Sequence, residues 1–409
     1  MESMPLLSDL RERFAEARLR TDELFDLVRP DSLFDRPVPE RYRLNFYIGH
    51  VDAFDWNMIS TCDLGLKPFQ ADFDSLFAFG IDPDSTALPS DQPSDWPGLW
   101  HTLSYCRRVR EKLDSVMDDI PEDIAETCIE HRLMHAETLC YLLHNLGPEK
   151  LLGEPPQALD APLAEWGAVA RQWIRIPAGE ARLGRAKGSG FGWDNEFGEH
   201  TVTLPDFSVR KYKVTNGEYL AFVNEGGSQP HYWRRRGQDW MLRTLFGEIP
   251  LPLDWPVYVT HAQAIAFAEY TDAALPSEAQ WDRSAYPAGD PSQRFPWGNA
   301  HAAQCANLDF RSWDPCSVTA TPAGDSAFGV AQLLGNGWEW TCDELRPFPG
   351  FEEYCFYPGY SSNFFDDEHF VLKGGSQRTA MRLARRSFRN WFRQDYPYVY
   401  ATFRLVHDE

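Results

Sequence analysis

The sequence predicts an α plus α+β protein, with an N-terminal four-helix bundle followed by a loop-rich α+β domain. Up to about residue 146, apolar residues recur every three or four positions, which is typical of packed amphipathic helices. From Trp173 the chain shows short β-type runs separated by glycines and aromatic loops. We therefore expect a helical domain over residues 1–150, a linker over 151–170 and a second domain over 171–409.

The N-terminal part contains four helical stretches of roughly twenty residues each. Ser8 is placed to cap the first, and Pro121 lies near the first turn of the fourth. Four such helices are the content of a bundle. The loop between the second and third, roughly residues 63–94, is long enough to carry function. The expected helices cover residues 4–28, 41–62, 94–117 and 121–146.

The linker begins at Gly147, in a stretch rich in proline and glycine. Beyond it, β-type runs are expected in residues 174–184, 199–215 and 369–376, and one embedded helix in residues 261–274. The second domain is expected to contain few regular elements joined by long loops, and we expect these loops to carry binding groups.

Composition narrows the class of protein. A formal charge of −22 repels phosphate backbones, so a general nucleic-acid surface is not expected. The eight cysteines form neither a CxxC pair nor a regular framework, which indicates reduced thiols of a cytosolic protein. The sequence shows neither a signal peptide nor an apolar run of ~20 residues, so we expect a cytoplasmic protein without a membrane partner. We further expect a monomer or weak oligomer.

Two histidines of the fourth helical stretch stand four residues apart. Residues i and i+4 share one face of a helix, so His131 and His135 can present two imidazoles to one metal ion. His50 lies in a second expected helix and is a third candidate ligand. Three neutral nitrogens leave half of an octahedral shell open, which suits a divalent iron. Glu137 points about 200° away from His135, so it suits a supporting role better than that of a fourth ligand.

The histidine spacing by itself leaves two alternatives open. A pair of histidines four apart on a helix is often two ordinary polar residues without a metal. If a metal is bound, the spacing does not choose between iron and zinc.

Segments of the C-terminal half resemble signature segments of the formylglycine-generating-enzyme, or sulfatase-modifying-factor, fold, which is C-type-lectin-like. They include GNGWEWTCDEL, VLKGGS, RRSFRNW and TFRLV, and they occur in family order over about 230 residues. The matching segments are residues 176–179, 191–223, 256–270, 275–286, 335–345, 371–376, 385–391 and 402–406. The bundle, with HxxxHxE and an upstream GH, resembles a DinB-type domain.

These two domains in this order are similar to the EgtB-like sulfoxide synthases. Members of that family are non-heme iron enzymes that use O2 to join a sulfur donor to the imidazole C2 of hercynine. The resemblance implies Fe(II) as cofactor, with His50, His131 and His135 as its ligands, and O2 as co-substrate. Iron with O2 supplies an oxidant stronger than any side chain for an unactivated imidazole carbon.

The resemblance also implies substrate-binding and catalytic residues. Asn390 and Trp391 match the positions that hold hercynine, where an indole beside a quaternary ammonium is physically apt. A catalytic tyrosine is expected on the loop before VLKGGS, where Tyr354, Tyr357 and Tyr360 are the candidates. Aromatic packing is the alternative role for one or two of them.

Departures from the family pattern concern the second substrate. Relatives that use γ-glutamylcysteine bind its carboxylates with arginines, yet here no Lys or Arg occurs between Lys67 and Arg107. Phe392 and Tyr396 stand where an acidic residue and an arginine are expected, and Met134 replaces a glutamine. Unpaired carboxylates in a pocket are costly, so these residues disfavour a dianionic donor.

The sequence therefore favours the selenoneine synthase (SenA) branch, with a neutral selenosugar donor. The loop over residues 77–96, polar but without cations, suits hydroxyl groups. Alternatives are an EgtB enzyme that uses cysteine or γ-glutamylcysteine, a DinB-type zinc thiol-transferase, and a non-catalytic binding protein. Formylglycine generation is not expected, because residues 371–409 contain no cysteine.

Overall fold

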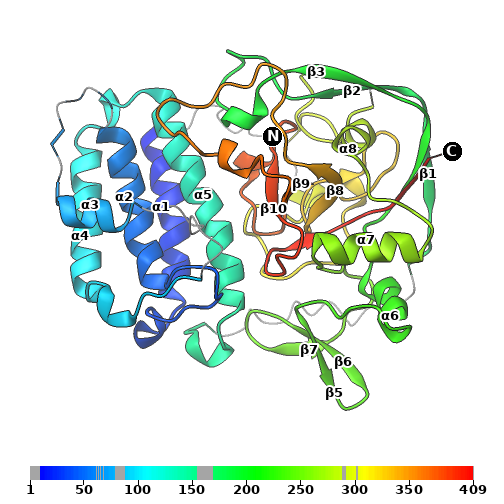
Figure 1. Cartoon of the computed structure of the whole chain (residues 1–409), viewed down its shortest axis with the longest axis horizontal. Coiled ribbons are helices and arrows are strands. Elements are labelled where there is room, and N and C mark those ends of the chain that lie inside the picture. Colours follow the sequence, from blue (N-terminus) through cyan, green and yellow to red (C-terminus); the bar gives the residue numbers. More distant parts are fainter. Residues whose placement is uncertain are drawn as a thin grey trace. The chain divides into compact units, whose positions relative to one another are not determined.

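The structure is a computed structural model that describes residues 10–408 except 61, 63, 65, 68, 79–87, 154–168, 288–291 and 301–302. The chain divides into two compact units, Met1–Glu154 and Pro155–Glu409 (Figure 1). The first is helical and the second is built from short strands and loops, so the predicted fold class is confirmed. Most of the predicted linker, and Ser8, lie outside the described residues.

The first unit contains a helix within each of the four predicted stretches. Pro121 directly precedes the last of them, as its N-cap residue. A further short helix, α3, lies within the predicted long loop, while residues 79–87 of that loop lie outside the described residues. The helices are α1 (Leu10–Asp26), α2 (Leu44–Ser60), α3 (Ala71–Leu76), α4 (Leu99–Asp114) and α5 (Glu122–His144).

The two most deeply buried helices of this unit are α2 and α5. Fifteen of the seventeen residues of α2 are buried, so the helix has no solvent-exposed face. Helix α5 packs on both α1 and α2, and α2 also packs on α4. Polar side chains on α2 and α5 are therefore held in a desolvated environment, where each needs a partner. A search of the described helices for an apolar stretch of bilayer length finds none.

The second unit is assembled from four small sheets. Their strand orders are β1-β4-β12, β10-β9-β8-β11, β2-β3 and β5-β6-β7. The strands are β1 (Trp173–Ile176), β2 (Gly179–Leu183), β3 (His200–Leu204), β4 (Phe207–Arg210), β5 (Trp233–Arg236), β6 (Asp239–Arg243), β7 (Glu248–Pro250), β8 (Trp338–Glu344), β9 (His369–Lys373), β10 (Asn390–Arg393), β11 (Ala401–Thr402) and β12 (Val406–Asp408).

The second unit has more helices than the sequence analysis named. The expected helix is present as α7 (His261–Tyr270), but α6 (Asn216–Asn224) and α8 (Glu278–Ala285) are also present. Each of the three begins with a capping box, in which a Ser or Thr side chain and a Glu or Gln three residues later satisfy each other's backbone N–H groups. The missed helices are only nine and eight residues long, too short for a clear apolar period.

The sheet β10-β9-β8-β11 fixes the positions of two predicted substrate-binding residues. Strand β10 pairs with β9 in antiparallel register, with Asn390 opposite Leu372 and Trp391 opposite Val371. Asn390 and Trp391 are thus the first two residues of β10, next to each other in the sheet.

Candidate metal centre and aromatic cluster

Three buried histidines of the first unit converge on one point. Helix α2 supplies His50, and successive turns of α5 supply His131 and His135. Their ligand nitrogens all lie within 4.8 Å of one another. Nε2 of His135 is 3.2 Å from Nε2 of His50 and 3.1 Å from Nε2 of His131. We call these residues the three-histidine cluster; the structure thus brings together all three predicted ligands.

Contacts around the cluster fix the orientation of the imidazole rings. Nδ1 of His50 lies 2.7 Å from the carbonyl oxygen of Phe77, to which it donates, so Nε2 keeps its lone pair for a ligand. Phe54 stacks on His131 with ring centroids 3.4 Å apart, and Phe46 stacks on His50 at 4.9 Å.

Gly49 allows the approach of Phe77 to His50. A Cβ at position 49 would lie 2.5 Å from the Phe77 ring, which is closer than atoms can pack. Phe77 is itself fully buried, so its ring has little room to move. Because Gly49 has no side chain, Phe77 can pack against it, and the Phe77 carbonyl can then bind Nδ1 of His50.

The electrostatics of the cluster favour neutral imidazoles. Burial lowers the pKa of His50 to about 4, against an opposing effect of its hydrogen bond to Phe77. Burial likewise holds the pKa of His131 and of His135 well below the usual value, and neighbouring positive charge lowers both further. Neutral imidazole is the form that binds a metal ion.

The cluster fits a single divalent metal ion. Nitrogen ligands about 2.1 Å from one ion lie about 3.0 to 3.4 Å apart in octahedral or tetrahedral arrangements. Two of the three Nε2 separations, 3.1 and 3.2 Å, fall in that interval, and the third is within 4.8 Å. Glu137 and Met134 are half-buried on α5, and Glu137 is outside this ligand group. As the sequence analysis anticipated, the spacing does not choose between iron and zinc.

Two cationic residues near the cluster were missed by the sequence analysis. Arg132, next to His131, is fully buried and bonds to Asp52 and Asp55 of α2. Arg41 is also buried, and its charge is among the causes that lower the pKa of His135. The three-residue spacing of the two aspartates, which places them on one face of α2, was a usable signal for Arg132.

In the second unit, Trp391 belongs to a group of packed rings. Its ring lies 5.5 Å from those of Tyr360 and Phe364, edge to face with the tyrosine. Tyr360 in turn stacks on Trp193 at 4.1 Å. The ring of Tyr357 is 5.5 Å from that of Tyr360. We call Trp193, Tyr357, Tyr360, Phe364 and Trp391 the aromatic cluster.

The three candidate tyrosines have different surroundings. The hydroxyl of Tyr354 donates to the carbonyl of Gly192, which commits it to the loop backbone. Burial, with a further effect of the Asp194 carboxylate, raises the pKa of Tyr357 to about 12. Tyr360 lies between Trp193 and Trp391. Only Tyr357 and Tyr360 among the three candidates join the aromatic cluster.

The remaining predicted substrate-binding residues lie on or just after β10. The amide oxygen of Asn390 accepts from the backbone N–H of Trp391, at 2.9 Å. Phe392 and Tyr396 stack on each other almost in parallel, with centroids 5.2 Å apart. Trp193 and Phe364 were missed, although Trp193 opens the WDNE segment that the sequence analysis used only for the family resemblance.

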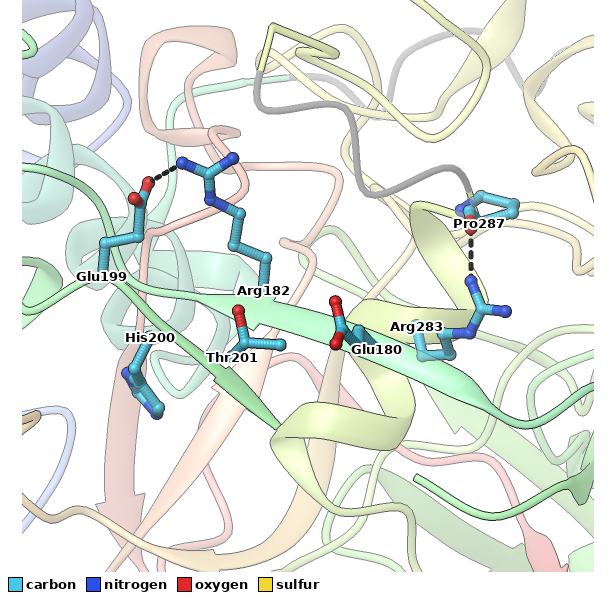
Figure 2. Close-up of a pocket in the computed structure, with 7 residues that line it drawn as sticks. All are labelled: Glu180, Arg182, Glu199, His200, Thr201, Arg283 and Pro287. Atoms are coloured by element: carbon cyan, nitrogen blue, oxygen red, sulfur yellow. Dashed lines mark hydrogen bonds and ion pairs between the residues drawn. The ribbon is translucent and has the colours of Figure 1, made fainter. Parts of the chain in front are cut away.

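A separate hollow of the second unit contains none of the predicted site residues. It is lined by Glu180, Arg182, Glu199, His200, Thr201, Arg283 and Pro287 (Figure 2). Two of its charged side chains form an ion pair, and a third donates to the backbone. Arg182 pairs with Glu199 at 2.5 Å, and Arg283 donates to the Pro287 carbonyl. We assign no role to this hollow.

Comparison with known proteins identifies the family. Residues 164–409 match the family described as "Sulfatase-modifying factor enzyme 1-like domain". The chain is 37% identical to a hercynine oxygenase of Mycolicibacterium smegmatis over 309 residues, covering 68% of this chain and 70% of that protein. It is 38% identical to the hercynine oxygenase of Mycobacterium tuberculosis over 240 residues, covering 53% and 56% respectively.

A third relative covers nearly the whole chain. Ergothioneine biosynthesis protein 1 of Neurospora crassa is 27% identical over 516 aligned positions, covering 99% of this chain and 58% of that protein. The chain thus spans less than two thirds of the length of two of these three relatives. A helical unit joined to a sulfatase-modifying-factor domain defines the class of protein. Within that class, the chain belongs to the EgtB-like hercynine oxygenase family and is an oxidoreductase.

Proposed function

We propose that the protein is an Fe(II)- and O2-dependent enzyme that forms a carbon–chalcogen bond at the imidazole C2 of hercynine. The observation that carries this proposal is the three-histidine cluster, in a chain similar to hercynine oxygenases. His50, His131 and His135 would hold the iron through their Nε2 atoms. The iron, when bound, supplies the activation of O2 that side chains cannot provide.

The overall reaction balances with O2 as the oxidant. The C2–H bond of hercynine and the chalcogen–H bond of the donor break, and the carbon–chalcogen bond forms. When the product is the chalcogen oxide, one oxygen atom stays on the chalcogen and the other leaves as water, which accounts for both hydrogens.

The aromatic cluster supports a role for Trp391 in holding hercynine. The faces of Trp391, Tyr360 and Phe364 can stabilise a trimethylammonium group by cation–π attraction. Asn390 follows the family pattern as a hydrogen-bond partner of the carboxylate. Its amide nitrogen suits this role, because its oxygen already accepts from the backbone.

We assign the role of hydrogen donor to Tyr357. With a pKa of about 12, its Oη hydrogen remains in place at neutral pH. Tyr357 is placed by its ring contact in the aromatic cluster that contains Trp391, whereas the hydroxyl of Tyr354 donates to the carbonyl of Gly192. Tyr360, packed between two tryptophans, is better suited to shape the aromatic cluster.

For the donor we favour a selenosugar, as in selenoneine synthases (SenA). The chain has no cation between Lys67 and Arg107, and Phe392 and Tyr396 occupy positions where relatives carry charged residues, so a neutral donor fits better than a dianionic one. Arg41 lies outside that stretch, is buried, and acts on His135 by its charge. This cation favours the alternative of a carboxylate-bearing donor, cysteine or γ-glutamylcysteine, in an EgtB-type sulfoxide synthase.

The experiment is a donor comparison with mass detection. Protein loaded with Fe(II) without oxygen receives hercynine, then O2 and one donor at a time: a selenosugar, cysteine or γ-glutamylcysteine. We expect the selenosugar adduct to form fastest. Fastest turnover with γ-glutamylcysteine and none with the selenosugar would contradict the choice of donor. Zinc-loaded protein is the control, and activity with zinc alone would instead support a DinB-type thiol-transferase.

A further inference from the structure

A buried ion-pair network joins α2 to α5 beside the three-histidine cluster. Nη2 of Arg132, the residue after His131, lies 2.6 Å from Oδ1 of Asp52 and 2.5 Å from Oδ2 of Asp55. The same nitrogen donates to the carbonyl of Val51 at 2.9 Å. The side chains of Arg132, Asp52 and Asp55 are fully buried. Arg132 thus binds α2 at the turn that directly follows His50.

The network extends to the other two long helices of the unit. Arg110 of α4 donates to both carboxylate oxygens of Asp52 at 3.0 Å. Its other two nitrogens bind Asp22 of α1, at 2.6 and 2.8 Å. Asp52 therefore has two arginine partners, and Arg132 is the one that comes from the histidine-bearing helix.

The position of Arg132 matters because ligand geometry depends on the register of two helices. A slip of α5 along α2 by one residue would shift its histidines by about 1.5 Å. A metal or catalytic constellation tolerates only about 0.5 Å. If α5 shifted against α2, apolar side chains could repack at a modest cost in free energy. A buried arginine would lose its ion pairs unless both carboxylates stayed within reach. A polar contact of this kind is well suited to fix register.

We propose that Arg132 is a positioning residue for the metal centre. By binding Asp52 and Asp55, it sets the register of α5 against α2, so that Nε2 of His131 and of His135 meets Nε2 of His50. The inference rests on the metal centre of the proposed function, but it does not depend on hercynine or on the chalcogen donor.

The test uses the full chain and a charge-neutral replacement of the network. Arg132→Met alone would leave two buried carboxylates without their partner, so this variant is expected to fold poorly. The triple variant Asp52→Asn/Asp55→Leu/Arg132→Met removes all three charges together; the amide oxygen at position 52 can still accept from Arg110, which also keeps Asp22. Replacing a buried ion pair by apolar groups of similar volume often leaves stability unchanged, so this variant is expected to fold.

The readout is metal binding, measured by titration with Fe(II) and with Co(II), whose absorption spectrum reports ligand geometry. For the triple variant we expect a dissociation constant 10- to 100-fold higher than for the wild type, and an altered Co(II) spectrum. Arg132→Lys, which can still reach one carboxylate, should give an intermediate constant. A triple variant that folds and binds both metals like the wild type overturns the inference.

A matched control separates positioning from general stabilisation. Arg13 of α1 pairs with Glu126 of α5, so this ion pair also joins two helices of the unit. The double variant Arg13→Met/Glu126→Gln, which removes both charges of this pair, should leave metal affinity and the Co(II) spectrum unchanged. If this double variant weakened binding as much as the triple variant does, loss of any interhelical ion pair would explain both results, and the positioning role would be wrong.

The two proposals fail in distinguishable ways. Tight metal binding without turnover of hercynine would contradict the proposed function and leave the role of Arg132 intact. Turnover of hercynine with unchanged metal affinity in the triple variant would contradict only the role of Arg132. A wild-type protein that binds neither Fe(II) nor Co(II) would overturn both.

Discussion

The three-histidine cluster and the aromatic cluster are built on different kinds of backbone. The histidines come from α2 and α5, two long helices that are buried along most of their length. The aromatic residues come from loops and from the first residues of β10. A helix fixes the spacing of its side chains by hydrogen bonds within itself, whereas a loop residue is placed by its tertiary contacts. The three-histidine cluster is therefore expected to be more rigid than the aromatic cluster.

The largest effect is expected from a substitution in the three-histidine cluster. His131→Ala removes one of three nitrogens and should lower metal affinity by more than about 100-fold and turnover by at least about 10³-fold. Metal content after dialysis and hercynine-dependent O2 uptake are the measurements. His101→Ala is the control, because His101 is exposed on α4 of the same unit. Retention of one metal ion per chain by His131→Ala would contradict the assignment of this ligand.

The next largest effect should distinguish the tyrosines. Tyr357→Phe removes the proposed hydrogen donor and should lower kcat about 10²- to 10⁴-fold, with metal affinity unchanged. Tyr354→Phe should cost only about 1 kcal/mol of stability, because its hydroxyl bonds to the backbone. Single-turnover kinetics and thermal unfolding of both variants provide the comparison. A loss of kcat in Tyr354→Phe but not in Tyr357→Phe would reverse the assignment.

Gly49→Ala tests whether the orientation of His50 matters within the rigid cluster. Alanine is a better helix former than glycine by about 1 kcal/mol, so a decrease in affinity could not come from helix propensity. The added Cβ would displace Phe77 and its carbonyl, and metal affinity should fall about 10- to 100-fold. Gly98→Ala is the control, because the nearest atom to its added Cβ would be Nδ1 of His101, at 3.6 Å. Equal metal affinities of the two variants would contradict the role of Gly49.

The smallest effect is expected for Trp391 of the aromatic cluster. Trp391→Ala should raise the dissociation constant of hercynine about 2- to 30-fold, the range of one cation–π contact. Trp391→Phe, which keeps an aromatic face, should lose less. Binding of histidine, which lacks the trimethylammonium group, should change little in either variant. If histidine and hercynine lost affinity equally, Trp391 would not recognise the ammonium group.

Two of the three histidines could be placed together from the sequence because helical periodicity puts residues 131 and 135 on one face, whereas the assignment of His50 as a ligand depended on the family resemblance. No comparable rule applies to the loop tyrosines, since their separation by three residues has no fixed geometric meaning outside a helix. Trp193 could not be paired with Tyr360 for the same reason, because more than 160 residues separate them. The spacing of Asp52 and Asp55 indicates a shared face of α2, but Arg132 could not be named as their partner, because residue spacing does not reveal which helices are neighbours.

The most direct test of the account is oxygen consumption by protein loaded with a single defined metal. Hercynine and a donor are added in air-saturated buffer to Fe(II)-loaded and Zn(II)-loaded protein, and O2 uptake is followed together with product mass. The account predicts that Fe(II)-loaded protein takes up O2 only when hercynine is present, and that Zn(II)-loaded protein takes up none. A hercynine adduct formed by the Zn(II)-loaded protein, or by Fe(II)-loaded protein without O2 uptake, would contradict it.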